Sequence, residues 1–405
     1  MLSEKVLNKM ADILANRIDE LQETIITEIA ESIARIGKLT PSKAHQLVQS
    51  LRYGNSYNNI INKIRQVTNL NKKQILEIFE ETAKKNQEFA KAFYEYRNID
   101  FIPYKDNVAL QREVKAMAKV SQETFTNLMR TAAFTTIKNG KKTFTPITRI
   151  YQETLDKALT SLELGQETAD QVIRKSIIEL TNSGIKTVDY ASGRSIRLDS
   201  AVRMHVMDGM RTLSNELQEQ FGEEFGADGI EVSHHINAAP DHIDTIDGKQ
   251  FFKPLNKKEE TQKYKTIDGK RYYNFKLMND SLQRPVSTMN CYHYTFNIVL
   301  GISPPQYTDK QLEKDKEKNK KGFEFEGKHY TMYEGTQLQR SMELKVRKLK
   351  EKKNALKELG TEDSLIQAGN VNRKIVQLTH KYDELCRVSG LPPKKERMRI
   401  IRKVA

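Results

Sequence analysis

The sequence predicts an α+β protein that is mainly α-helical, and two observations carry this prediction. Apolar residues recur at helical spacing over most of the first 184 residues and again near the C-terminus. Short β-prone runs with Asp-Gly turns gather between these helical parts. We therefore expect a helical N-terminal region (1–184), a small α+β domain containing hairpins (185–305) and a basic helical C-terminal region (306–405).

The composition excludes several classes of protein. Of the 405 residues, 38% are hydrophobic and 30% are charged, and Trp is absent. No apolar run approaches the ~18–20 residues that a membrane span requires, and the charged N-terminus lacks the apolar core of a signal peptide. Two cysteines, Cys291 and Cys386, cannot build a disulfide framework. We expect a protein without a membrane anchor that is made in a reducing cytoplasm.

Residues 2–36 predict one long amphipathic helix that ends at Gly37. Steps of four and three place its large apolar residues on one face: Leu14, Ile18, Leu21, Ile25, Ile29 and Ile33. Further helices are expected at 42–51, 56–67 and 71–97, the last beginning near Asn71.

A loop is expected at 98–107, followed by a helix over 107–137 and a turn at 138–143. Helices at 147–164 and 167–182 complete the N-terminal region. Several separate apolar stripes need partners, so these helices bury them against each other or against further subunits. Self-association is therefore one of the two ways in which these stripes can be covered.

The pattern changes at residue 185. Two β-prone runs flank 191-ASG-193, which indicates a hairpin, and a helix over 200–221 and a strand over 229–236 follow. The string TIDGK occurs at 245–249 and again at 266–270, and 326-EGKHYT-331 is similar. An Asp-Gly pair between β-prone residues favours a hairpin at each copy. The charged stretch 256–265 between the first two copies is interpreted as a loop tip.

The C-terminal region is strongly charged. The run 309-DKQLEKDKEKNKKG-322 is interpreted as a solvated, mobile linker. Helices are expected at 335–358 and 364–388, and the last dozen residues are basic and amphipathic.

The net charge of +14 lies mostly in this region, where residues 308–405 hold 25 Lys and Arg against 15 Asp and Glu. Such an excess favours polyanions, either nucleic acid or an acidic protein surface, although lysines on helices are often only solvated. The candidate phosphate-binding residues are Lys345, Arg347, Lys348, Lys350, Lys352, Lys353, Lys394, Lys395 and Arg397.

A segment rich in His, Asp and Cys raises the question of a metal site. Residues 234-HHINAAPDHIDTID-247 precede 290-NCYH-293, so half of the eight histidines lie within sixty residues. Zinc takes about four N, S or O ligands, and Cys291 and His293 would share one side of an extended chain. The candidate ligands are His235, His242, Cys291 and His293, with Asp241 as an alternative to His242. The competing interpretation is that these residues cap turns and that Cys291 packs as a small apolar residue.

Recognised catalytic motifs are absent from the sequence. It contains no Gly-x-Ser-x-Gly nucleophile elbow, no GxxxxGK[ST] loop and no GxGxxG fingerprint. The expectation is a protein that is not an enzyme and has no cofactor, with a zinc ion in the His/Cys segment as the alternative. The alternative is a metal-dependent nuclease or hydrolase built on the cluster at 234–293.

Three longer strings carry a resemblance to a known family. They are GRSIRLDSAVRMHVMDGMRTLSNELQEQFGEEFGADGIEVSHH, APDHIDTIDGKQF and RPVSTMNCYHYTFNIVLGISPPQY, and the ending GLPPKKERMRI fits as well. Over about 185–400 the chain resembles the bacteriophage minor capsid protein family called phage minor capsid protein 2. It is similar, more distantly, to Mu F-like head-morphogenesis proteins.

The Mu F-like relatives have a His-Pro-Asn-Cys-Arg-Cys-like string where this chain has 288-TMNCYH-293. Asn290 and Cys291 match, and His293 stands at the position of the second Cys. The upstream Cys-rich element corresponds to 239-APDH-242, without cysteine.

The resemblance implies a low-copy structural component inside the phage head, close to the portal. Its implied role is to aid head morphogenesis, DNA packaging or DNA ejection. Its implied partners are the portal protein, capsid or scaffold proteins and packaged double-stranded DNA. It would reside in the host cytoplasm only during assembly.

Overall fold

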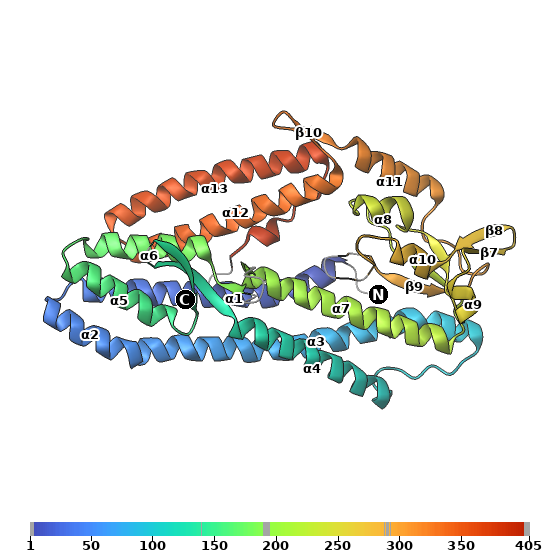
Figure 1. Ribbon diagram of the computed structural model, residues 1–405, viewed down its shortest axis with the longest axis horizontal. Helices are drawn as coiled ribbons and strands as arrows, with labels where there is room; N and C mark the ends of the chain where they lie inside the picture. Colours follow the sequence, from blue (N-terminus) through green and yellow to red (C-terminus); the bar gives the residue numbers. More distant parts are fainter. Residues whose placement is uncertain are drawn as a thin grey trace.

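The computed structural model describes residues 4–138, 140–188, 195–286, 288, 291 and 293–400. Long helices run along the length of an elongated molecule, and the short strands between residues 229 and 298 gather at one end (Figure 1). The mainly α-helical α+β class is confirmed.

Helix α1 (Glu4–Ile36) lies at the centre of the bundle and confirms the first predicted helix. It packs against α3 (Asn55–Arg97), α6 (Ala169–Ser183), α7 (Leu198–Glu224) and α12 (Met332–Leu359). All six residues of the predicted apolar face are buried. Because α1 is contacted from several sides, its buried surface is wider than a single stripe.

The helices expected at 56–67 and 71–97 form one helix, α3, preceded by α2 (Pro41–Tyr53). Asn71, expected to start a helix, lies inside α3 and is fully buried. Its side-chain amide contacts α1, where it accepts from Arg17 at 3.0 Å and donates to the Leu14 carbonyl at 3.4 Å. Asn71 therefore joins two helices instead of beginning one.

The helix expected over 107–137 is shorter, because α4 (Val108–Arg130) ends before strand β1 (Ala132–Lys138). The β-branched run 135-TTI-137 pairs in register with β2 (Lys141–Pro146). Strands β3 (Lys186–Val188) and β4 (Ser195–Arg197) extend this sheet in the order β2-β1-β3-β4. The expected turn at 191–193 lies outside the described residues. Helix α5 (Ile150–Glu163) follows β2 and precedes α6 along the chain.

The end of the molecule that carries the candidate site is built on three antiparallel strands. Strand β5 (Gly229–Val232) lies between β6 (Gln250–Phe252) and β9 (Thr295–Ile298). Between β5 and β9 the chain also forms α8 (Pro240–Thr245), α9 (Lys257–Glu260) and α10 (Phe275–Asp280). The stretch 256–265, interpreted as a loop tip, thus contains the short helix α9.

Two of the three Gly-turn repeats form hairpins. Strands β7 (Tyr264–Ile267) and β8 (Lys270–Tyr273) meet at Asp268-Gly269, where both φ angles are positive. Strands β10 (Phe323–Phe325) and β11 (Lys328–Tyr330) meet in the same way at Glu326-Gly327. The first copy does not form a hairpin, because the helix α8 precedes Asp247-Gly248.

The run expected to be a solvated, mobile linker is helix α11 (Asp309–Lys321): most of its residues are exposed, as expected, but they form a regular helix in place of a linker. Thr308 caps it by accepting a hydrogen bond from the Gln311 amide. The helix is also held in place, because Lys316 Nζ lies 3.0 Å from Asp244 Oδ1. Helices α12 and α13 (Glu362–Ser389) then form an antiparallel pair, followed by a 3-10 turn (Lys395–Met398).

One hydrophobic core runs through most of the molecule and takes residues from all three predicted regions, from Ala11 to Met398. Smaller apolar clusters lie in the three-stranded end, one around Val232, Ile246 and Phe251. The division at 184 and 305 therefore stays a prediction about how the chain is organised.

Candidate metal centre and basic surfaces

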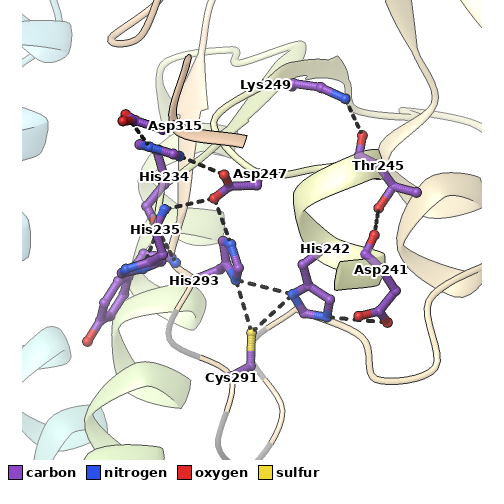
Figure 2. A network of polar contacts seen from close by, with 12 residues as sticks. His234, His235, Asp241, His242, Thr245, Asp247, Lys249, Cys291, His293 and Asp315 are labelled. Carbon is purple, nitrogen blue, oxygen red and sulfur yellow. Dashed lines mark hydrogen bonds and ion pairs between the residues drawn. The ribbon is translucent and has the colours of Figure 1, made fainter. Parts of the chain in front are cut away.

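Three candidate ligands converge in the three-stranded end of the molecule. His242 belongs to α8, whereas Cys291 and His293 lie in the segment before β9 (Figure 2). The two Nδ1 atoms of His242 and His293 are 3.2 Å apart. Cys291 Sγ lies 3.5 Å from His293 Nδ1 and 3.9 Å from His242 Nδ1. All three side chains are buried, and they form a group able to hold a metal ion.

The outer nitrogens of both rings have hydrogen-bond acceptors. His242 Nε2 lies 2.7 Å from the Arg284 carbonyl oxygen, and His293 Nε2 lies 2.9 Å from Asp247 Oδ1. A carbonyl oxygen can only accept, so Nε2 of His242 carries a proton and donates it to Arg284. Acceptors that hold the outer ring nitrogen in this way fix the orientation of histidines that bind metals.

Asp247 is the centre of a wider network. Its Oδ1 also accepts from the His235 backbone amide at 2.8 Å, and its Oδ2 lies 2.6 Å from His234 Nδ1. His234 Nε2 in turn lies 3.1 Å from Asp315 Oδ2 on α11. A continuous chain of polar contacts thus connects the three-residue cluster to α11 (Figure 2).

This network shifts several pKa values. Burial raises the pKa of Cys291, but hydrogen bonds with His242 and His293 outweigh it and lower the pKa to about 5. Burial lowers the pKa of His293, and the bonds to Asp247 and Cys291 raise it to about 9. Burial of Asp247 is outweighed by its histidine partners, which lower its pKa to about 2. Without a metal, the cluster is therefore a thiolate beside an imidazolium.

The sequence-based ligand set is only partly brought together. His242, Cys291 and His293 form the described group, and His235 does not join it. The His235 Nε2 atom lies 3.3 Å from Ser233 Oγ, and its ring packs edge-on against that of His293. Asp241 Oδ2 lies 4.0 Å from Nε2 of His242, the nitrogen that faces away from the cluster. Sequence reasoning missed Asp315, because a contact over so long a sequence separation leaves no local pattern.

Arg347 was predicted to contact phosphates, and the structure corrects this. Its side chain is 7% exposed, and Nη2 lies 2.6 Å from Asp19 and 2.5 Å from Asp199. Arg197 also donates hydrogen bonds to Asp199, at 2.9 Å, and to Glu351, at 2.8 Å. These five residues form a buried ionic cluster that joins α1, the start of α7 and α12.

Other members of the predicted DNA-contacting set are engaged within the chain. Lys348 donates to the Asn182 carbonyl, Lys350 to the Met398 carbonyl and Lys353 to Asn372. Lys395 pairs with Asp383, and Arg397 donates to Asn8. Lys352 and Lys394 are half-buried, and Lys345 is exposed. DNA contact by these residues stays a prediction, and their internal contacts weaken the case for it.

A different set of basic residues faces solvent on α11. Lys310, Lys314, Lys318 and Lys321 are all exposed, and steps of four and three place them on one face of the helix. Within the described part of the chain, no carboxylate pairs with any of the four ammonium groups. We call them the α11 lysine stripe. Its spacing is visible in the sequence, but interpretation of the run as a linker concealed it.

The fold and site define a helical protein with a small β-containing end and a buried His/Cys cluster. The chain belongs to the family named phage minor capsid protein 2, whose model matches residues 2–384. The match extends through the N-terminal helices, beyond the 185–400 range where motifs carry the resemblance. Comparison with curated proteins and with solved structures gives no match.

Membership of this family makes the chain a structural component of a phage head, and its place is in the virion. In the described ranges, no helix is both long and apolar enough to cross a membrane.

Proposed function

We propose that this minor capsid protein acts inside the phage head, near the portal, where it contacts packaged double-stranded DNA without reading its sequence. Membership of a family of phage capsid proteins supports the place in the head. The α11 lysine stripe carries the proposal of DNA contact.

The stripe suits a phosphate backbone better than the basic residues of α12 do. A charge that binds DNA has to be exposed and must not be neutralised within the protein, and both hold for the four stripe lysines. The opposite face of α11 is anchored by Asp315 and Lys316. The helix is thus a rigid support that holds four positive charges outward, and binding of this kind releases counterions and weakens with salt.

The test compares two variants of equal charge. The first variant replaces the four stripe lysines by Gln: Lys310, Lys314, Lys318 and Lys321. The control variant replaces four lysines that are engaged within the chain by Gln: Lys348, Lys350, Lys353 and Lys395. Binding to a random-sequence duplex is measured by fluorescence anisotropy over a range of salt concentrations. A plot of log K against log salt has a negative slope, and its steepness should fall by about 3–4 in the stripe variant, roughly 0.9 for each lost phosphate contact.

The control variant should leave that slope nearly unchanged. Equal losses in both variants would refute the role of the stripe, and no salt-dependent binding by the natural chain would refute DNA contact altogether. Thermal unfolding of each variant shows whether it is folded.

Contact with the portal, with capsid or scaffold proteins and between copies of the chain is part of the same proposal. Chemical cross-linking of intact virions, followed by mass spectrometry, tests it. Cross-links from this chain to the portal are expected; cross-links only to the outer shell would place it elsewhere in the particle.

An enzymatic role, as a metal-dependent nuclease or hydrolase, is the alternative. It receives no support from the family, which is one of minor capsid proteins. The burial of all three clustered ligands also argues against it, because a substrate needs access to the metal.

A further inference from the structure

We propose that His242, Cys291 and His293 bind a single zinc ion that fastens the small β-containing end of the molecule. This site is separate from the DNA contact proposed above and does not depend on it.

The spacing of the three atoms matches tetrahedral coordination. Bonds of about 2.05 Å to imidazole nitrogen and about 2.3 Å to thiolate sulfur place two nitrogens about 3.3 Å apart. The same geometry places sulfur and nitrogen about 3.6 Å apart. The observed separations are 3.2 Å between the nitrogens and 3.5 and 3.9 Å from sulfur to each nitrogen.

The polarity of the cluster also favours a cation. The Nε2 atoms point outward and donate hydrogen bonds to the Arg284 carbonyl and to Asp247. Both Nδ1 atoms therefore face one point, where they can coordinate a cation. Cys291 Sγ faces the same point. A metal ion would replace the proton on His293 Nδ1, which otherwise faces Cys291 and His242. Asp247 would still accept a hydrogen bond from His293 Nε2 and so orient the ring.

The donor set selects the type of ion. One thiolate and two imidazoles suit zinc and disfavour magnesium and calcium, which prefer oxygen. Three protein ligands leave a fourth position for water. The exposed fractions of His242, Cys291 and His293 are only 2%, 3% and 3%, which indicates a structural role and not turnover of a substrate.

The ion would connect segments that are distant in sequence. His242 lies in α8, and Cys291 and His293 lie about fifty positions later, directly before β9. Strands β5, β6 and β9 are only three or four residues long, and the apolar cluster beside them is small. A metal bond contributes folding free energy in such a domain directly.

The first experiment measures metal in the full-length chain. The protein, made without a histidine tag, is incubated with zinc, dialysed and assayed by elemental mass spectrometry. We expect about one equivalent of zinc per chain. Replacement by Co²⁺ should give the near-ultraviolet charge-transfer band of a thiolate–cobalt bond and the visible bands of a tetrahedral ion.

Single variants then locate the ion. Cys291→Ser and His242→Gln should each lose the zinc and the charge-transfer band. Cys386→Ser is the matched control, because Cys386 is the other buried cysteine and lies outside the group, on α13, where it contacts Gln339; this variant should keep both. His235→Gln, at the neighbouring histidine outside the group, should also retain the ion.

A readout on the natural chain guards against variants that fail to fold. Alkylation of Cys291, followed by peptide mass spectrometry, should be slow with zinc and at least ten-fold faster after chelation, while Cys386 serves as the internal reference. The proposal is overturned if the folded natural chain retains no zinc. It is also overturned if zinc survives in Cys291→Ser or if chelation leaves the alkylation of Cys291 unchanged.

Discussion

At the residue scale, Asp19 and Asp199 are two buried carboxylates in one ionic cluster with opposite tendencies. Burial raises the pKa of Asp19 to about 7, even though Arg347 opposes the shift. Burial acts on Asp199 as well, but Arg197 and Arg347 outweigh it and hold its pKa well below the usual range. The difference arises because Asp199 accepts hydrogen bonds from both arginines, whereas Asp19 accepts one from Arg347 and lies 3.7 Å from Arg197. The neighbouring carboxylates Asp199 and Glu351 raise the pKa of Asp19 further.

This difference predicts unequal effects of two similar substitutions. Asp199→Asn leaves two buried arginines without their shared carboxylate and should cost about 3–5 kcal/mol of unfolding free energy. Asp19→Asn resembles a carboxyl group that is already largely protonated near neutral pH and should cost about 1 kcal/mol or less. Urea unfolding at pH 6.5 checks this; equal costs would contradict the assigned charges.

The raised pKa of Asp19 also predicts a pH dependence of stability. The folded chain holds this proton up to a pH of about 7, whereas the unfolded chain releases it near 3.8. The stabilisation is therefore complete below pH 3.8 and is lost as the pH rises toward 7. Relative to Asp19→Asn, the natural chain should lose on the order of 1–3 kcal/mol between pH 4.5 and 7.5. A constant difference across that range would refute the shift.

At the scale of single elements, α11 shows how a strongly charged segment becomes ordered. Its sequence alone indicates a solvated run, but several of its side chains bind it to the rest of the molecule. Asp315 meets His234, and Lys316 and Lys320 meet Asp244, so these ion pairs lie on the segment that supplies the candidate metal ligand His242. Asn319 adds a contact with α12, because it accepts from the Tyr333 amide at 3.2 Å.

The docking of α11 should therefore depend on Asp315. Asp315→Asn removes the charge that faces His234, and amide hydrogen exchange over 309–321 should become at least ten-fold faster. Glu317→Gln, an exposed position on the same helix, is the matched control and should leave exchange unchanged. Exchange that stays slow in Asp315→Asn would show that Lys316 and the apolar contacts of α11 suffice.

At the scale of the whole molecule, the N- and C-terminal helices depend on each other. Helix α12 packs on α1 and α6, and its Arg347 and Glu351 complete the ionic cluster formed with Asp19, Arg197 and Asp199. One hydrophobic core includes residues from both ends of the chain.

Truncation should therefore unfold more than the part removed. A chain ending at residue 307 loses α12, exposes the part of α1 that α12 covers and leaves Asp19 and Asp199 with Arg197 as their remaining arginine. We expect loss of the cooperative thermal transition, measured by circular dichroism. A truncated chain with a sharp transition would instead support three independently folding regions.

Local sequence determined much of this protein: the class of the fold, most helices, and the β7–β8 and β10–β11 hairpins. These features depend on periodicity, on turn residues and on composition, which act over a few positions. Of the four candidate ligands chosen from sequence, three lie together in the structure, and their binding of a metal stays a prediction. Cys291 and His293 could be paired from their spacing because two residues in extended chain share a side.

Tertiary structure decided which residues meet across long stretches of the chain, because the spacing of residues in the sequence holds no information about such contacts. Asn71 looks like a helix start and is instead a buried link between α1 and α3. Arg347 looks like a solvent-exposed cation on a basic helix, but it is buried and donates hydrogen bonds to Asp19 of α1 and Asp199 of α7. His235 and His242 were equally plausible ligands from sequence, and only the packing of α8 against the segment before β9 brings His242 to the cluster. In each case the partner is distant in the chain, so long-range contact and desolvation, and not local propensity, determine the role of the residue.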